Sequence, residues 1–289
     1  MVAFEFNDKQ YYIDNRLKLQ LDKKVIPDLK RNDKDAVFVV DGEERSGKSV
    51  FSMGMGAYIS AAFKKNFDLS NVCMDPLEFR SKIETAGKNE VVIYDEAHRG
   101  MASARSLSEI NKILKDLMME MGQRNLFVII VLPTIFLLDK YAALFRARGL
   151  FHVYENKRRR GYWTYFNKKN KLLLYMRGKK EFNYNCMKYP YFRGRFYNQY
   201  PIDEALYREK KGNSFKTSEK TTKTEKFESQ RNLLYWIMYN EYDIPVQQIV
   251  NQLKIYSKKY KTYETTQSTV QMHRILKPFK EKDALIAEP

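Results

Sequence analysis

The octapeptide Gly42-Glu-Glu-Arg-Ser-Gly-Lys-Ser49 constrains this chain more than any other feature of its 289 residues. It matches the phosphate-binding pattern G-x-x-x-x-G-K-[ST], whose glycines let the backbone wrap closely around phosphate groups. The apolar run 36–40 before it predicts a buried strand, and residues 48–66 after it predict a helix. This order points the loop amides and the positive end of the helix at one place. A chance octapeptide in a surface turn is the alternative.

The motif predicts a nucleoside triphosphate site, with ATP and Mg²⁺ as the expected ligands. Lys48 would reach the β- and γ-phosphates as a catalytic residue, and Ser49 would hold the metal. The predicted nucleotide-binding residues are Gly42, Glu43, Glu44, Arg45, Ser46, Gly47, Lys48, Ser49 and Val50.

A second short apolar run, 91–94, is followed at once by Asp95 and Glu96. Cleavage of a phosphoanhydride requires a carboxylate near the metal and a group that positions the attacking water. The run resembles a Walker B strand, which predicts Asp95 near Mg²⁺ and Glu96 as the catalytic base. Two solvated carboxylates in a turn are the alternative.

Apolar runs alternate with helical patterns from residue 36 onward, which is typical of a parallel sheet covered on both faces. Strands are expected at 36–40, 71–74, 91–94, 126–132 and 150–154, and helices at 48–66, 75–86, 106–121 and 135–147. We therefore predict an α/β fold with five core strands over 36–156. Residues 1–35 are expected to be an extension that packs on this core or on another subunit.

These features resemble the additional-strand (ASCE) P-loop ATPases, and among them the FtsK–HerA and zonula occludens toxin-like ATPases of archaea and their viruses. The resemblance rests on Gly42–Ser49, 91–100 and 123–148. It implies a RecA-like fold with a polar sensor at Thr134, and a homo-oligomer, expected as a hexameric ring, in which a neighbour donates an arginine. The candidates for that arginine are Arg124, Arg146 and Arg148. The alternatives are a helix N-cap for Thr134 and ordinary surface positions for the arginines.

The positive charge of the chain is concentrated downstream of residue 150. Residues 1–150 carry 23 basic and 21 acidic side chains, whereas residues 151–289 carry 29 and 14. This asymmetry favours a polyanionic partner, and we expect double-stranded DNA. Residues 157–211 are expected to form a basic hairpin, with its turn at 167–170, and an aromatic arm; an anionic membrane surface is the competing partner. The predicted nucleic-acid contacts are Lys157, Arg158, Arg159, Arg160, Lys168, Lys169 and Lys171.

The remainder of the chain is predicted to be a linker and a small helical domain. Residues 212–226 are polar and low in complexity, and residues 227–289 carry helical patterns at 227–242, 245–253 and 265–276. Three short helices resemble a helix-turn-helix or winged-helix module, in which Gln267, Gln271 and Arg274 would face base edges. A helical domain that docks a viral or other partner protein is the alternative.

Taken together, the patterns predict a Mg²⁺-dependent, DNA-dependent ATP hydrolase. The expected activity is translocation of double-stranded DNA, in packaging of a viral or mobile-element genome or in replication or segregation. With two cysteines and no evident signal peptide or spanning segment, we expect a cytoplasmic protein, in the host cytoplasm if viral. Two alternatives stay open: a nucleotide-switched DNA-binding regulator, and a non-motor assembly or secretion ATPase that acts on protein or membrane.

Overall fold

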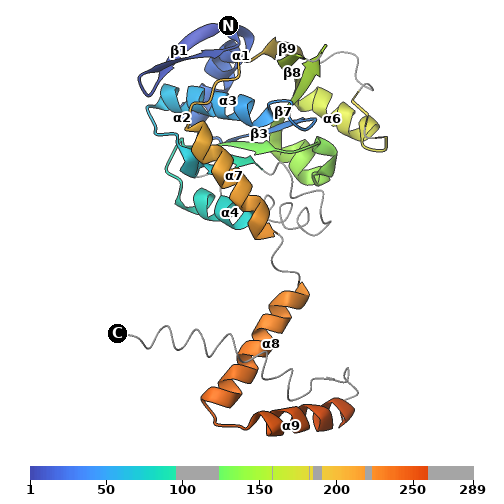
Figure 1. The fold of residues 1–289 in the computed structure, drawn as a ribbon. Helices are drawn as coiled ribbons and strands as arrows, with labels where there is room; N and C mark the ends of the chain where they lie inside the picture. Colours follow the sequence, from blue (N-terminus) through green and yellow to red (C-terminus); the bar gives the residue numbers. More distant parts are fainter. Residues whose placement is uncertain (96–123, 158, 182, 185–190, 219–222, 260–289) are drawn as a thin grey trace. The chain divides into compact units, whose positions relative to one another are not determined.

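A mostly parallel sheet organises the first of the two units into which the chain divides, Met1–Thr217 and Ser218–Pro289. The computed structural model describes residues 1–95, 124–157, 159–181, 183–184, 191–218 and 223–259 (Figure 1). Within that part of the chain the sheet has seven strands. In spatial order they are β4 (Val72–Cys73), β5 (Val91–Asp95), β6 (Phe127–Val131), β3 (Ala36–Gly42), β7 (Ala147–Asn156), β8 (Arg159–Asn167) and β9 (Phe192–Arg195).

The first five strands in this order are parallel, and β8 and β9 add antiparallel pairs at one side. The predicted α/β class is therefore confirmed, and the strand order is compatible with a Rossmann or RecA-like arrangement. The helices and turns in the described residues of this unit are α1 (Asn15–Gln20), η1 (Leu21–Val25), α2 (Ile26–Arg31), α3 (Lys48–Phe63), η2 (Leu69–Asn71), α4 (Pro76–Thr85), η5 (Ile135–Leu137), η6 (Ala142–Arg146), α6 (Lys168–Gly178) and α7 (Glu204–Ser218).

The central strands are apolar at nearly every position because both faces of the sheet are covered. Along β3, Phe38 and Val40 pack into the core beneath α3, whereas Val37 and Val39 pack into the core beneath α4 and α6. All five predicted strands are present. The helices predicted at 48–66 and 75–86 are α3 and α4. The helix predicted at 106–121 lies outside the described residues.

The N-terminal segment packs against α3 rather than standing apart. The hairpin of β1 (Val2–Phe6) and β2 (Lys9–Ile13) leads into α1, η1 and α2. Phe6, Leu17 and Leu29 are buried in the same core as α3 and one face of the sheet. This segment therefore belongs to the first unit, where Figure 1 shows it beside α3.

The helix predicted at 135–147 is not present. Thr134 caps a single 3-10 turn, η5, and a short π-helical turn, η6, leads directly into β7, which begins at Ala147. Leu138 is extended, which ends the first turn before a helix can propagate. The apolar side chains of this stretch, Ile135 and Leu144 among them, still fill the core as predicted for buried residues.

The predicted hairpin turn at 167–170 is also wrong. The hairpin is formed by β7 and β8 with its turn between Asn156 and Arg159, and the stretch 168–178 is the helix α6. The signal for that helix is local: the Asn167 side chain accepts a hydrogen bond from the Asn170 amide, as an N-cap does.

The second unit contains α8 (Lys223–Asn240) and α9 (Val246–Lys259) within its described part. They share a small core of Tyr235, Trp236, Val246, Ile249 and Val250. The helices predicted at 227–242 and 245–253 are thus present, and the one predicted at 265–276 lies outside the described residues. Much of the predicted linker 212–226 is helical, because α7 continues to Ser218 and α8 begins at Lys223; lysine and glutamate are good helix formers.

No helix in the described part of the chain is long and apolar enough to cross a membrane.

Lys171 is a structural residue, which corrects its prediction as a nucleic-acid contact. The side chain is fully buried, and its ammonium donates hydrogen bonds to the carbonyls of Ala143, Leu144 and Ala147. These carbonyls lie where η6 ends and β7 begins, so the lysine holds the turn that leads into β7.

We predict that Lys171→Met lowers the free energy of unfolding by about 2 kcal/mol or more, because it leaves buried carbonyls without a donor. Urea denaturation followed by circular dichroism measures this. Lys169→Met is the matched control: Lys169 lies exposed in the same helix, and its removal should change stability by no more than about 0.5 kcal/mol. Equal effects of the two substitutions would contradict the role given to Lys171.

Candidate nucleotide-binding site

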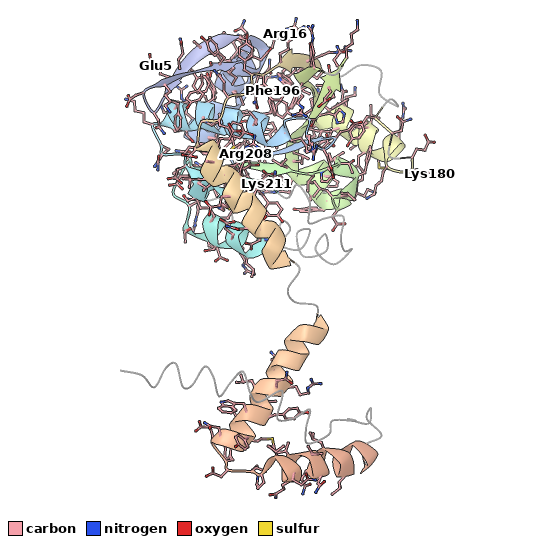
Figure 2. The ribbon with its side chains drawn as sticks, viewed as in Figure 1. Glu5, Arg16, Lys180, Phe196, Arg208 and Lys211 are labelled. Carbon is pink, nitrogen blue, oxygen red and sulfur yellow. The ribbon has the colours of Figure 1, made fainter. Side chains whose placement is uncertain are left out.

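The loop between β3 and α3 is formed by two glycines that no other residue can replace without strain. Gly42 has φ +142°, and a Cβ there would lie 1.9 Å from the Val153 carbonyl oxygen of β7. Gly47 has φ +98°, stands at the N-cap of α3 and lies against the ring of Phe196, which follows β9 (Figure 2). Since Gly47 provides no side-chain cap, the first amides of α3 are left for another acceptor, the arrangement that suits an anion.

The other predicted residues of the loop divide into a tip and a base. Glu43, Glu44 and Arg45 are exposed at the tip, whereas Ser46 is buried and donates to the Glu43 carbonyl at 2.8 Å. Val50 points into the core beneath α3. The loop is therefore held by its own backbone and leaves its outer side to solvent.

Lys48 lies at the base of the loop with only 7% of its surface exposed. Its ammonium donates to the carbonyls of Gly42 at 2.6 Å and Glu43 at 2.5 Å. Burial lowers the pKa of Lys48, and the negative charges of Asp41 and Asp95 oppose that effect. A cation is thus held inside the loop by partners that a phosphate group can replace.

Ser49 and Asp95 meet at the carboxyl edge of the sheet, although one begins α3 and the other ends β5. The Lys211 ammonium from α7 lies 3.3 Å from Ser49 Oγ and 3.2 Å from Asp95 Oδ2 (Figure 2). The hydroxyl of Tyr207, one turn earlier on α7, donates to the same Asp95 oxygen. Burial and the charge of Asp95 raise the pKa of Tyr207, so the phenol keeps its proton.

The oxygen atoms of Ser49 and Asp95 are suited to bind a hydrated magnesium ion. Asp95 is 2% exposed; its Oδ2 lies with Ser49 Oγ around the Lys211 ammonium and is the oxygen placed to hold the metal, whereas its Oδ1 has no hydrogen-bond partner among the described residues. A hydroxyl and a carboxylate oxygen are hard ligands of the kind that Mg²⁺ prefers, with water and phosphate oxygens to complete its shell. No group of three or more His, Cys, Asp or Glu side chains in the described part of the chain forms a site that would hold a metal without such help.

A second polar cluster surrounds Asp41, the residue before the loop. The fully buried Asp41 carboxylate accepts from the Ile135 amide at 2.8 Å and from the Tyr184 hydroxyl, and lies 2.8 Å from His152 Nδ1. The Tyr184 hydroxyl is also 2.6 Å from Thr134 Oγ1. A hollow of about 640 Å³, lined by Gly42, Glu43, His152 and Tyr184 among others, opens beside this cluster.

Thr134 lies at the carboxyl edge of the sheet, the same edge that carries the loop Gly42–Ser49. Its Oγ1 accepts from the Phe136 amide at 3.3 Å, so it does cap the following turn. The role of sensor stays a prediction.

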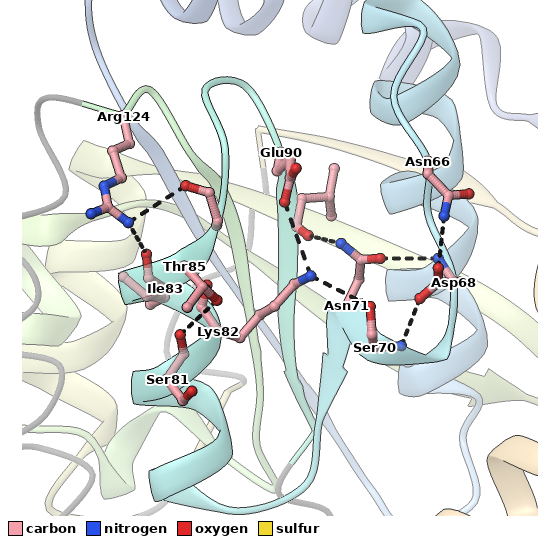
Figure 3. Close-up of polar contacts among 12 residues, drawn as sticks. Asn66, Asp68, Ser70, Asn71, Ser81, Lys82, Ile83, Thr85, Glu90 and Arg124 are labelled. Carbon is pink, nitrogen blue, oxygen red and sulfur yellow. Dashed lines mark hydrogen bonds and ion pairs between the residues drawn. The ribbon is translucent and has the colours of Figure 1, made fainter.

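The three candidate arginines lie at the amino ends of strands, the edge opposite the loop. Arg124 donates to the carbonyls of Ile83 and Glu84 at the end of α4 (Figure 3). Arg146 pairs with Asp35 at 2.6 Å and Arg148 with Asp28 at 2.5 Å. Each has a partner within its own chain, and a role in the site of another subunit stays a prediction.

Figure 3 also shows how the ends of α4 and β5 are fixed around Arg124. Lys82 of α4 reaches Glu90 at 4.0 Å and Ser70 Oγ at 3.4 Å, and Asn71 donates to the Val91 carbonyl at 2.9 Å. These bonds fix the start of β5, the strand that carries Asp95 at its other end.

The predicted nucleic-acid contacts separate into two places. Lys157, Arg159 and Arg160 are exposed at the β7–β8 turn, on the same edge as the loop, because Gly42 pairs with Val153. Lys168 and Lys169 lie at the other end of β8, roughly 25 Å away at the usual rise of a strand. Arg158, Gln267, Gln271 and Arg274, and the predicted base Glu96, lie outside the described residues.

Five residues of the site were not predicted: Asp41, His152, Tyr184, Tyr207 and Lys211. Asp41 had a signal, since a charged residue directly before the motif ends an otherwise apolar strand. The other four come from distant segments, and no spacing in the sequence ties them to the loop.

We predict that Asp41→Asn lowers the free energy of unfolding by about 2 kcal/mol, because an amide cannot replace a carboxylate that serves three donors. Asp8→Asn is the control, since Asp8 is exposed and asparagine tolerates its positive φ of 56°. Chemical denaturation compares the two. A loss for Asp41→Asn no larger than that for Asp8→Asn would contradict the account of this cluster.

No model of a known protein family matches the chain, and the comparison with curated proteins also gave no match. The chemistry of the site therefore has to be argued from its own residues.

Proposed function

We propose that this chain is a Mg²⁺-dependent ATPase whose nucleotide lies on the loop Gly42–Ser49. One observation carries the proposal: Ser49 and Asp95, from separate elements, come within reach of a single cation beside the buried Lys48. A strand–loop–helix with uncapped amides and a lysine inside the loop is suited to phosphates.

Each residue of the proposed site has a separate role in binding or cleavage of ATP. Lys48 would neutralise the β- and γ-phosphates, and the first amides of α3 would bind their oxygens. Ser49 and Asp95 would hold Mg²⁺, which when bound supplies positive charge to the phosphate oxygens. Glu96, the next residue after Asp95 in the sequence, is proposed to position the attacking water.

We further propose double-stranded DNA as the partner that the ATPase acts on. The excess of basic over acidic residues lies in 151–289, and the exposed basic β7–β8 turn lies on the same edge as the nucleotide loop. The proposed activity is therefore that of an oligomeric DNA translocase, with helices of the second unit as a further DNA-binding or docking element. A role in genome packaging or in DNA movement fits this activity.

Replacement of Lys48 tests the nucleotide site. Lys48→Ala should reduce ATP affinity at least about 100-fold, because a buried cation that meets two phosphates is lost. Lys65→Ala, at the exposed end after α3, is the matched control and should bind as the unsubstituted protein does. Isothermal titration calorimetry with Mg²⁺–ATP gives both values.

Glu96→Gln separates binding from hydrolysis in the same experiment. It should keep ATP affinity and lose turnover by at least about 100-fold, the range typical of a general base. A Glu96→Gln protein with normal turnover would refute the catalytic assignment and leave the nucleotide site intact.

Salt dependence tests the DNA partner. The double substitution Lys157→Ala, Arg159→Ala should make the slope of log K against log salt shallower by about 2, since each lost phosphate contact removes about one released counterion. The pair Lys168→Ala, Lys169→Ala removes equal charge at the other predicted place, the far end of β8, and leaves the slope unchanged if the β7–β8 turn carries the phosphate contacts. Fluorescence anisotropy with a labelled duplex measures the slope.

Measurements of ATP turnover also distinguish the motor from the two alternative functions. Strong, salt-sensitive stimulation of ATP turnover by duplex DNA supports a motor. Slow turnover with binding to one defined sequence would favour a nucleotide-switched regulator. Stimulation by vesicles or a protein, and none by DNA, would favour an assembly ATPase.

A further inference from the structure

Helix α7 places a lysine between the two oxygens that are proposed to hold magnesium. Lys211 Nζ lies 3.3 Å from Ser49 Oγ and 3.2 Å from Asp95 Oδ2, and it is 3.0 Å from the Tyr207 hydroxyl. An ammonium group in this position satisfies the same charge and the same lone pairs that a metal would. Mg²⁺ approaches its oxygen ligands to about 2.1 Å, so the metal and the ammonium cannot share these two oxygens.

The placement of Lys211 is fixed by further contacts of α7 with the sheet edge. Tyr207 is 4% exposed and its hydroxyl is bonded to Asp95. On the neighbouring position Lys210 pairs with Glu78 of α4 and donates to the Val72 carbonyl at 2.6 Å. Lys210 therefore attaches α7 to α4, and Lys211 attaches it to the carboxyl edge of the sheet.

Charge around the loop argues against Lys211 remaining in place beside a metal. Lys48 and Lys211 both face Asp95, and the positive charge of Lys211 contributes to the lowering of the Lys48 pKa. A divalent ion added at the same point would bring a third cationic group to the buried carboxylate of Asp95. That repulsion is relieved when Lys211, whose side chain is 21% exposed, moves to solvent, whereas Lys48 is buried in the loop.

We propose that Lys211 is an intramolecular competitor of Mg²⁺ for Ser49 and Asp95, so that binding of the Mg²⁺–nucleotide expels it and loosens the contact of α7 with the sheet edge. The inference rests on the proposed nucleotide site. In this proposal, the contact of α7 with the sheet edge depends on whether metal and nucleotide are bound. In the chain α7 ends at Ser218, where the second unit begins.

The test is the Mg²⁺ requirement for tight binding of a fluorescent ATP analogue. Lys211→Met removes the ammonium and keeps the length of the side chain. The Mg²⁺ concentration for half-maximal tightening should fall roughly tenfold, the factor expected if the lysine-bound arrangement outnumbers the open one by about ten to one. Affinity for the analogue in EDTA should not increase by that factor.

Arg208→Met is the matched control, because Arg208 lies on the same helix and pairs with the exposed Glu204 (Figure 2). It should leave the Mg²⁺ requirement unchanged. A requirement for Lys211→Met equal to that of Arg208→Met, or higher than that of the unsubstituted protein, would overturn the proposal; a higher one would make Lys211 an aid to nucleotide binding.

Hydrogen–deuterium exchange of the unsubstituted protein gives a second readout that needs no variant. Amides of 204–218 should exchange faster with a non-hydrolysable ATP analogue plus Mg²⁺ than with the analogue in EDTA. Equal exchange in the two conditions would show that α7 is not released. If the unsubstituted protein binds no nucleotide at all, the proposed function fails with it; if it binds and the Mg²⁺ requirement ignores Lys211, only this inference fails.

Discussion

The parallel pairing of β3, β6 and β5 is the constraint on which the rest of the site depends. Val40 and Asp95 both pair with Val131 of β6, so β5 ends level with Val40, two residues before β3 ends at Gly42. Because parallel strands share one carboxyl edge, the loop after β3 and the carboxylate at the end of β5 must lie there together. A shift of one residue in the β5–β6 pairing would turn Asp95 to the other face of the sheet.

This edge carries two buried carboxylates, and each is compensated in a different way. The hydrogen-bond partners of the Asp41 carboxylate are the Ile135 amide, the Tyr184 hydroxyl and the His152 imidazole. Asp95 has one phenol and one lysine on a single oxygen, and its other oxygen has no partner among the described residues. A buried carboxylate with incomplete compensation is costly, and such sites are kept for function. The two aspartates thus separate into a structural and a proposed metal-binding one.

The parts of the fold that sequence predicts are those with local signals. Buried strands such as 91–94 are short apolar runs, and α3 follows a motif that requires a helix. Residues 135–147 were predicted as helix because their apolar content is that of a core, yet core packing does not fix helical geometry. Lys171 lies in a basic run, which predicts a DNA contact. Its burial depends on carbonyls 24 to 28 residues earlier in the chain, and no local pattern shows them. Lys211 carried no signal for the same reason: Ser49 and Asp95 are its partners only in three dimensions.

The loop Gly42–Ser49 and the elements around it are joined by two contacts of different kinds. The loop meets the β7–β8 hairpin at the pairing of Gly42 with Val153, where a Cβ on Gly42 would lie 1.9 Å from the Val153 carbonyl oxygen. That contact is part of the sheet and can position the basic turn. The contact with α7 is made by side chains, Tyr207 and Lys211, whose partner oxygens are those a metal would claim. Coupling between sites requires an element with two arrangements whose balance a ligand can change, and the proposed competition between Lys211 and Mg²⁺ would give α7 two such arrangements.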